Sequence, residues 1–387
     1  MKSSYKLDGL LGLEYFITDT CGTGGKLRTR VEDFFVEELQ NDTEEHPDGE
    51  YTHFTLEKTN WDTLRAIKEI ARSLGVSRKR FGFAGTKDRR AVTRQRVAIW
   101  KVEPEVLKRV KIRDLNLSDF KKSDERVSLG DAAGNRFKIT VRDVTTEKDR
   151  LETILKETAS QLEYRGVPNY FGYQRFGTIR PNTHLVGREL LRGDIKGAAL
   201  AYLTNPFDSE REDAYNARKI LEETMDFKRA LEIFPKRLGY ERSMLDLLSK
   251  NPNDYAGALR RLPKKLRRML VHAYQGYLFN KILSRAIEKN IESETIPLFG
   301  SETLFSDGEQ SDIEMSVLEE EGTSLEDFNI SSMPELSEKG HFRDAFIRAH
   351  PKFTVNEDAY TCEFELPKGS YATVVLREFM KTDPLNY

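Results

Sequence analysis

The order of strand-like and helix-like segments constrains the fold of this 387-residue chain more than any other feature. Strand patterns dominate the first 145 residues. One of the clearest covers residues 135–144, where apolar Phe137, Ile139 and Val141 alternate with polar residues. From about Thr178 helical patterns follow one another, and strand patterns return after His350. A largely helical insertion that splits an α+β, sheet-containing domain accounts for this order.

The same patterns predict individual elements. We expect strands at residues 34–39, 51–58, 94–102, 135–144, 360–366 and 371–378. In the first part of the chain we expect helices at residues 64–74, with Asn60 as N-cap and Gly75 as the stop, and at residues 147–164. Further helices are expected at residues 185–192, 213–225, 226–234, 245–248 and 266–290.

Charge is also distributed unevenly. Residues 290–338 contain 14 Asp or Glu and no Lys or Arg, so removing them from the net charge of −2 leaves +12 on the rest of the chain. Residues 78–113 hold 13 Lys or Arg against 3 Asp or Glu. This asymmetry favours a polyanionic partner. We expect the acidic stretch, which contains several turn-forming residues, to run along a surface away from that partner.

Several protein classes can be set aside. Cys21 and Cys362 are the only cysteines, which is too few for a disulfide framework and indicates a reducing, cytoplasmic environment. The six histidines are scattered singly, so we expect no metal site. No apolar run approaches the roughly 20 residues needed to cross a bilayer, and we expect no membrane association.

The most distinctive chemistry lies in the segment that follows Phe81. A short apolar strand reaches a glycine, and Asp88 then stands among Lys87, Arg89, Arg90 and, further on, Arg94. Positive neighbours favour the ionised form of a carboxylate and attract a phosphate backbone. Such a carboxylate suits nucleophilic or base chemistry on RNA. A surface turn with ordinary ion pairs explains the same residues, so this pattern alone leaves both interpretations open.

The run from Gly85 through Lys87, Asp88 and 91–93 to Gln95 strongly resembles the signature of the TruD family of tRNA pseudouridine synthases. Further segments resemble the family in the same order along the chain. They are Arg28 with residues 32–34, residues 134–137, 166–177, 272–280 and 366–373. The resemblance therefore extends from Arg28 to Thr373.

This resemblance implies a pseudouridine synthase catalytic domain of α+β class with a mixed, largely antiparallel sheet. A mostly helical, family-specific insertion domain would interrupt it. We expect the catalytic domain to comprise residues 1–177 and 346–387, and the insertion domain residues 178–345.

The resemblance also implies roles for individual residues. Asp88 matches the catalytic aspartate; Phe137 would stack on the target uracil, and Asn135 would hydrogen-bond the Asp88 carboxylate. Arg28 would pair with that carboxylate. Lys87 would face phosphate or cover the loop, and a core position for Phe137 is the alternative to stacking. Possible RNA contacts are Arg89, Arg90, Arg94, Gln95 and Arg175.

By the same resemblance, the chain is expected to isomerise a uridine of tRNA, at position 13 of the D-arm, to pseudouridine. No cofactor or metal is implied, because substrate and product are isomers, and we expect a monomer. Asp88 would attack the ribose, attack the base, or remove the C2′ proton. The alternatives are a non-catalytic RNA-binding protein, or an RNA-directed glycosidase or nuclease, which normally needs a second positioned carboxylate or a metal.

Overall fold

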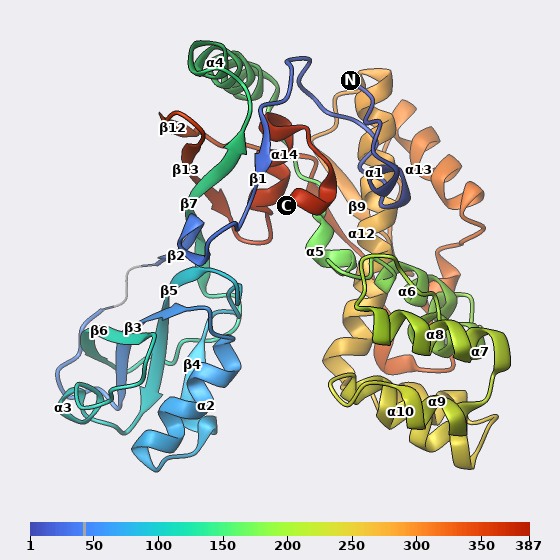
Figure 1. Cartoon of the computed structure of the whole chain (residues 1–387), viewed down its shortest axis with the longest axis horizontal. Coiled ribbons are helices and arrows are strands. Elements are labelled where there is room, and N and C mark those ends of the chain that lie inside the picture. Colours follow the sequence, from blue (N-terminus) through green and yellow to red (C-terminus); the bar gives the residue numbers. More distant parts are fainter. Residues whose placement is uncertain (42–43) are drawn as a thin grey trace. The chain divides into compact units, whose positions relative to one another are not determined.

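The computed structural model describes residues 1–41 and 44–387, which form two compact units. We call Ile17–Val167 with Ile347–Tyr387 the sheet unit, and Met1–Phe16 with Pro168–Phe346 the helical unit. Each unit is described by itself (Figure 1). The chain passes between the units at three points: between Phe16 and Ile17, within the short strand β8 (Val167–Pro168) and within the short strand β11 (Phe346–Ile347).

The sheet unit contains strands and helices in a mixed order. Its strands are β1 (Gly24–Lys26), β2 (Phe34–Gln40), β3 (Tyr51–Thr59), β4 (Phe81–Phe83), β5 (Val92–Trp100), β6 (Leu115–Ser123), β7 (Ala132–Val144), β12 (Lys352–Val355) and β13 (Tyr360–Pro367). Its helices are α2 (Thr63–Leu74), α3 (Pro104–Leu107), α4 (Lys148–Arg165) and α14 (Ala372–Met380), with short 3₁₀ turns at Val31–Asp33, Arg78–Arg80 and Pro384–Asn386.

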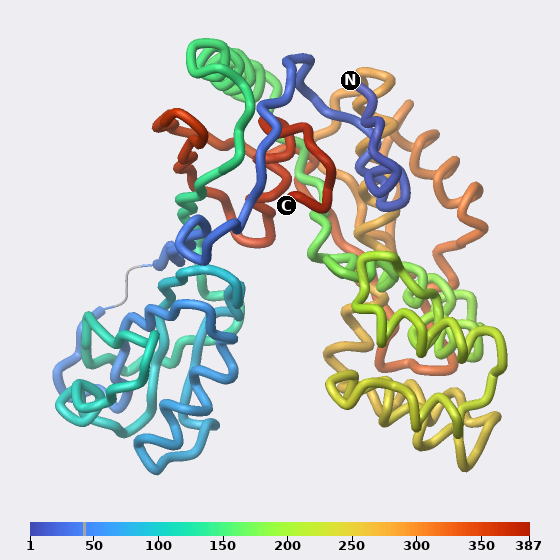
Figure 2. The backbone as a smooth tube through the Cα atoms, in the orientation of Figure 1, coloured from blue at the N-terminus to red at the C-terminus, as the bar shows by residue number. Residues whose placement is uncertain are grey.

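These strands form one sheet in the order β12-β13-β7-β2-β5-β3-β6, with β1 beside β7 and β4 beside β5. Within the described residues only β2 and β5 pair in parallel, and the other neighbours are antiparallel. The predicted α+β class and the mixed, largely antiparallel sheet are therefore confirmed. Figure 2 shows the C-terminal strands β12 and β13, in red, beside the green β7.

The core under the site lies between α2 and one face of β3, β4 and β5. Phe54 and Leu56 of β3, together with Val97 and Ile99 of β5, pack against the apolar stripe of α2. Side chains two residues apart on a strand share a face, so the next inward position on β3 after Leu56 is Lys58. The polar side chain thus follows two core residues at the edge of the core.

Helix α2 begins at a different residue from the predicted N-cap. The carboxylate of Asp62 accepts a hydrogen bond from the backbone N–H of Arg65, so Asp62 caps the helix and Asn60 lies before it in a left-handed turn with φ of 58°. Gly75 ends the helix with φ of 67°, a conformation that glycine adopts without steric cost. The predicted stop is confirmed and the predicted N-cap is wrong.

The prediction of a strand at residues 371–378 is also wrong. Residues Ala372–Met380 form helix α14, and every one of its nine residues is buried. A helix that is buried all round shows no polar face from which the 3.6-residue period can be recognised. Its Val374-Val375 pair is typical of strands, which is why the segment resembles one.

The helical unit consists mainly of helices around α12. Its elements are α1 (Lys6–Leu10), α5 (Tyr173–Phe176), α6 (Thr183–Leu191), α7 (Ile195–Leu203), α8 (Glu212–Thr224), α9 (Phe227–Ile233), α10 (Gly239–Lys250), α11 (Tyr255–Arg260), α12 (Lys264–Lys289), β9 (Thr295–Leu298), α13 (Glu309–Glu320) and β10 (His341–Asp344), with 3₁₀ turns at Glu326–Phe328 and Pro334–Leu336. Helices α6 and α12 approach closely at Gly187, where no side chain intervenes. A Cβ atom at this position would lie only 2.1 Å from the carbonyl oxygen of Leu270.

Residues 1–16 and 168–177 group with these helices rather than with the sheet, which differs from the expected division. Tyr173 donates a hydrogen bond to Asp8, and the backbone N–H of Phe171 donates to Asn280 Oδ1 at 2.8 Å. Asn280 also donates to the carbonyl oxygen of Leu11 at 3.0 Å. These contacts attach both segments to α12.

The acidic stretch of residues 290–338 is more structured than its turn-forming residues suggest, since it includes β9 and α13. Its carboxylates pair with cations of α12. Lys281 contacts Glu320 and Glu321 at 2.7 and 2.6 Å, and Arg268 contacts Glu338 at 3.0 Å. Part of the negative charge is therefore matched within the helical unit.

Candidate active site

Asp88 lies in the loop that joins β4 to β5, on the sheet unit. Its side chain is 47% exposed, and Oδ2 accepts a hydrogen bond from Arg28 Nη2 at 2.7 Å. The loop therefore presents a carboxylate that is open to solvent and already oriented by a cation. The contact is the pairing of Arg28 with the Asp88 carboxylate that the family resemblance implied.

Arg28 reaches Asp88 from the turn that follows β1, and its own side chain is only 14% exposed. Its backbone is left-handed, with φ of 55°, and its guanidinium lies 4.1 Å from the ring centre of Phe34. Burial lowers the pKa of Arg28, the Asp88 carboxylate raises it, and nearby Arg90 lowers it. An arginine remains charged despite such a shift because its ordinary pKa is so high.

Lys58, at the edge of the core, contacts the backbone of the same loop. Its ammonium donates hydrogen bonds to the carbonyl oxygen of Asp88 at 2.7 Å and, more weakly, to that of Lys87 at 3.4 Å. The sequence prediction missed Lys58. The available signal was a lysine at an inward position of an alternating strand, two residues after Leu56 and four after Phe54.

Thr63 and Gln95 fix the beginning of the loop. The backbone N–H of Lys87 donates to Thr63 Oγ1 at 3.0 Å, and Thr63 in turn donates to Gln95 Oε1 at 3.2 Å. Gln95 Nε2 donates to the carbonyl oxygen of Gly85 at 2.9 Å. Gln95, expected as an RNA contact, is 1% exposed, and its amide is used to support the loop.

Lys87 turns its side chain into the protein. Its ammonium lies 2.8 Å from Glu38 Oε2 and donates to Asn135 Oδ1 at 2.7 Å. Asn135 was expected to bond Asp88 directly, but its carbonyl oxygen accepts from Lys87 instead. Lys87 was expected to face phosphate or to cover the loop; in the structure its ammonium contacts Glu38 and Asn135 instead. Glu38, which the sequence prediction missed, is 1% exposed and belongs to β2.

Phe137 lies on β7, two residues after Asn135 and on the same face. Its ring stacks on that of Phe364 in β13, with centroids 5.5 Å apart and planes 28° apart. Phe34 meets it edge-on at 6.5 Å. Phe137 is thus held in a fixed orientation by two aromatic neighbours, one of which also supports Arg28.

The arginines predicted as RNA contacts differ in their surroundings. Arg89 and Arg90 are exposed beside Asp88. Arg94 points to the other face of the sheet from Gln95, where it pairs with Glu57 at 2.5 Å and Glu37 at 3.9 Å. The hydrogen bond to Glu57 raises the pKa of Arg94.

Arg175 belongs to α5 in the helical unit, where its guanidinium lies 5.1 Å from the ring centre of Phe171. Its Nε is buried and has no hydrogen-bond partner among the described residues.

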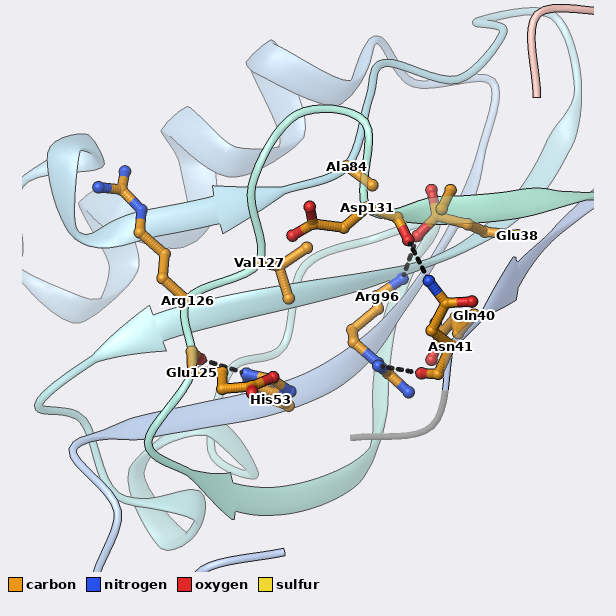
Figure 3. A pocket seen from close by; sticks show the side chains of 11 residues that line it. Glu38, Gln40, Asn41, His53, Ala84, Arg96, Glu125, Arg126, Val127 and Asp131 are labelled. Atoms are coloured by element: carbon orange, nitrogen blue, oxygen red, sulfur yellow. Dashed lines mark hydrogen bonds between the residues drawn. The ribbon is translucent and has the colours of Figure 1, made fainter. Parts of the chain in front are cut away.

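A cavity of about 170 Å³ lies next to the loop network (Figure 3). Glu38 lines it, and its other charged lining residues are of both signs, including Arg96, Arg126 and Asp131. Arg96 donates to the carbonyl oxygen of Asn41 at 3.0 Å, as the dashed line in Figure 3 marks. The buried Glu38 carboxylate therefore both lines this polar cavity and pairs with Lys87.

Within residues 1–41 and 44–387 no group of three or more His, Cys, Asp or Glu side chains is arranged to hold a metal ion. No helix in the same ranges has the length and apolar character required to cross a bilayer.

The chain is similar to known proteins over nearly its whole length. The family profile described as tRNA pseudouridine synthase D (TruD) matches residues 10–296 and 291–379. A Methanosarcina barkeri protein named "Probable tRNA pseudouridine synthase D" is 40% identical over 98% of both chains. A Methanopyrus kandleri protein with the same name is 44% identical over 87% of this chain and 86% of its own.

A solved structure gives the same result. The crystal structure of a Methanosarcina mazei protein described as "Putative tRNA pseudouridine synthase D (TruD)" superposes with a TM-score of 0.85. The two proteins are 39% identical, and the match covers 98% of each chain.

Proposed function

Because the chain belongs to the tRNA pseudouridine synthase D (TruD) family, we propose that it converts a uridine of tRNA to pseudouridine with Asp88 as the catalytic aspartate. The observation that carries this assignment is the Arg28–Asp88 contact of 2.7 Å at the surface of a loop whose backbone is held from several sides. An ionised, oriented and accessible carboxylate is the group that this chemistry requires.

The reaction breaks the N1–C1′ bond of the uridine and joins C1′ to C5 of the same base. The C5 proton is lost and N1 gains a proton, so substrate and product are isomers and no redox partner is consumed. Between the two steps the detached uracil must stay bound and rotate. We assign this task to Phe137, whose ring would stack on the base.

Arg28 would orient the Asp88 carboxylate directly. Asn135 would act indirectly, because it binds Lys87 and thereby holds the loop.

Asp88 has three candidate tasks: attack on C1′, attack on the base, or removal of the C2′ proton. Deuterium at C2′ of the target uridine separates the last from the others, because only proton removal gives a primary isotope effect on single-turnover conversion. Mass spectrometry of the quenched reaction distinguishes a ribose ester from a base adduct.

The target uridine must leave its helix stack before Asp88 can reach C1′, which costs a few kcal/mol. Contacts to phosphates would offset this cost. Arg89 and Arg90, exposed beside Asp88, are placed for such contacts, and Arg175 is proposed for the same role on the helical unit. We propose uridine 13 of the D-arm as the target.

One experiment tests the assignment. Unmodified tRNA is incubated with the protein, and pseudouridine is mapped by primer-extension stops that depend on carbodiimide treatment. A stop at position 13 is expected for the wild type and none for Asp88→Ala. Strand scission or an abasic product would favour a hydrolase, and tRNA binding without any conversion would favour a binding protein. Full activity of Asp88→Ala would remove Asp88 from the mechanism.

In this proposal the sheet unit is the catalytic domain, and the helical unit corresponds to the insertion domain, extended by residues 1–16 and 168–177. A cytoplasmic location and action as a monomer complete the proposal. Two unpaired cysteines, Cys21 and Cys362, suit a reducing compartment. Light scattering of the protein, alone and with tRNA, measures the oligomeric state.

A further inference from the structure

Lys58 is a buried lysine with an unusual set of partners. It is 0% exposed, yet its ammonium forms no ion pair with any described carboxylate. Its hydrogen bonds run instead to the backbone carbonyl oxygens of Asp88 and Lys87. Lys281 of the helical unit provides the contrast, since that buried lysine is neutralised by Glu320 and Glu321 at 2.7 and 2.6 Å.

An ammonium in this position is unfavourable for folding by itself. Burial lowers the pKa of Lys58 to about 8, while the charges of Asp88 and Asp62 raise it and that of Lys87 lowers it. A methionine would fill similar space without the cost of removing a charge from water. The position therefore calls for a reason other than packing.

The two carbonyl groups that Lys58 binds supply that reason. They belong to consecutive residues, and the second is the carbonyl of Asp88 itself. Hydrogen bonds from a charged donor are shorter and stronger than neutral ones. Arg28 fixes the carboxylate end of Asp88, whereas Lys58 fixes its backbone end, so the residue is held at both ends.

Building on the proposed function, we propose that Lys58 is a positioning residue for Asp88: its ammonium holds the two carbonyl groups of the loop and thereby sets the direction in which the carboxylate projects. The Lys58 ammonium also places a positive charge near that carboxylate. Lys58 acts through the loop and does not touch the substrate.

The test compares Lys58→Met, which removes the ammonium, with Lys58→Arg, which keeps a cation. Lys156→Met serves as a control, because Lys156 is an exposed residue of α4 paired with Glu152. We expect Lys58→Met to lower kcat about 10²-fold, the effect of a misplacement of about 1 Å, with KM and tRNA affinity nearly unchanged. The control should match the wild type.

A pH profile separates positioning from a merely structural role. The charged groups facing Lys58 are Asp88 and Lys87 on the loop and Asp62 at the start of α2. As pH rises through about 8, the wild type should lose kcat because the ammonium loses its proton. Lys58→Arg, charged throughout, and Lys58→Met, uncharged throughout, should both lack this decline.

The outcomes are distinguishable. A wild type that forms no pseudouridine defeats the proposed function itself. An active wild type with an equally active Lys58→Met, or with the same alkaline decline in Lys58→Arg, overturns the positioning role. A Lys58→Met whose kcat falls only in parallel with its tRNA affinity also overturns it. If Lys58→Met fails to fold, the comparison of the wild-type and Lys58→Arg pH profiles decides.

Discussion

Arg28 Nη2 lies 2.7 Å from Asp88 Oδ2 although 60 residues separate the two in the chain. The guanidinium is held on its other side by the ring of Phe34, 4.1 Å away. The compact ammonium of lysine can donate to the carboxylate but cannot also stack on the ring, so lysine should replace this planar cation only in part.

Arg28→Met should therefore lower kcat about 10²-fold while tRNA affinity changes little, because the carboxylate loses its orienting donor. Arg28→Lys should recover only part of the loss. Single-turnover conversion of tRNA and a filter-binding measurement give the two quantities. Lys26→Met, which removes an exposed cation of β1 paired with Asp143, is the matched control. Equal activity of Arg28→Lys and the wild type would contradict the stacking argument.

Breaking the buried pair of Glu38 and Lys87 should destabilise the sheet unit. Their side chains are 1% and 10% exposed, so Glu38→Gln leaves a poorly solvated ammonium and should lower the free energy of unfolding by about 3 kcal/mol. Glu363→Gln, in the exposed pair with Lys138, should cost less than about 1 kcal/mol. Urea unfolding measures both.

The double variant Glu38→Gln with Lys87→Met removes both the Lys87 ammonium and the carboxylate that pairs with it. It should be more stable than the sum of the two single changes predicts, because the residues share one interaction. Strict additivity of the three free energies would show that the ion pair contributes nothing.

Phe137 and Phe364 provide a test of base stacking, since they are partners in one aromatic pair. Replacing either with leucine removes that pair and should lower the free energy of unfolding by about 1 kcal/mol. Only Phe137→Leu should also reduce kcat strongly, because only Phe137 is proposed to stack on uracil. A comparable loss of kcat in Phe364→Leu would assign both rings to packing alone.

The Lys58 ammonium should leave a signature in the pH dependence of stability. Its pKa is about 8 in the folded chain against an ordinary value of 10.5, so between these values the unfolded chain binds more protons. Stability therefore rises with pH in this window, by up to about 3 kcal/mol. The free energy of unfolding of the wild type minus that of Lys58→Met should increase from pH 8 to 10.5. A constant difference would contradict the shifted pKa.

Local patterns predicted much of the sheet unit. The alternation in residues 51–58 and 135–144 corresponds to β3 and β7, and Gly75 ends α2 as expected. The short run around Asp88 could be placed in a loop after an apolar strand. These features depend on neighbours in sequence, which periodicity and turn chemistry report.

Partners across strands could not be predicted in the same way. Gln95 looks like an exposed continuation of a basic run, but its place on β5 turns it inward to Gly85 and Thr63. Asn135 bonds Lys87 because β7 runs beside β2, where Glu38 holds the same ammonium. Which side chains meet depends on strand order and register, and a single sequence does not contain that information.

The contact of Phe137 with Phe364 also determines when this site can be completed. Strand β13 pairs with β7 residue by residue, but it begins only at Tyr360 of 387, after the whole helical unit has been synthesised. Until then one edge of β7 has no partner strand, and its aromatic face lacks a covering ring. During translation the aromatic pair of Phe137 and Phe364 is therefore among the last parts of the site to form. A chain that stops before Tyr360 exposes an unpaired strand edge that can aggregate.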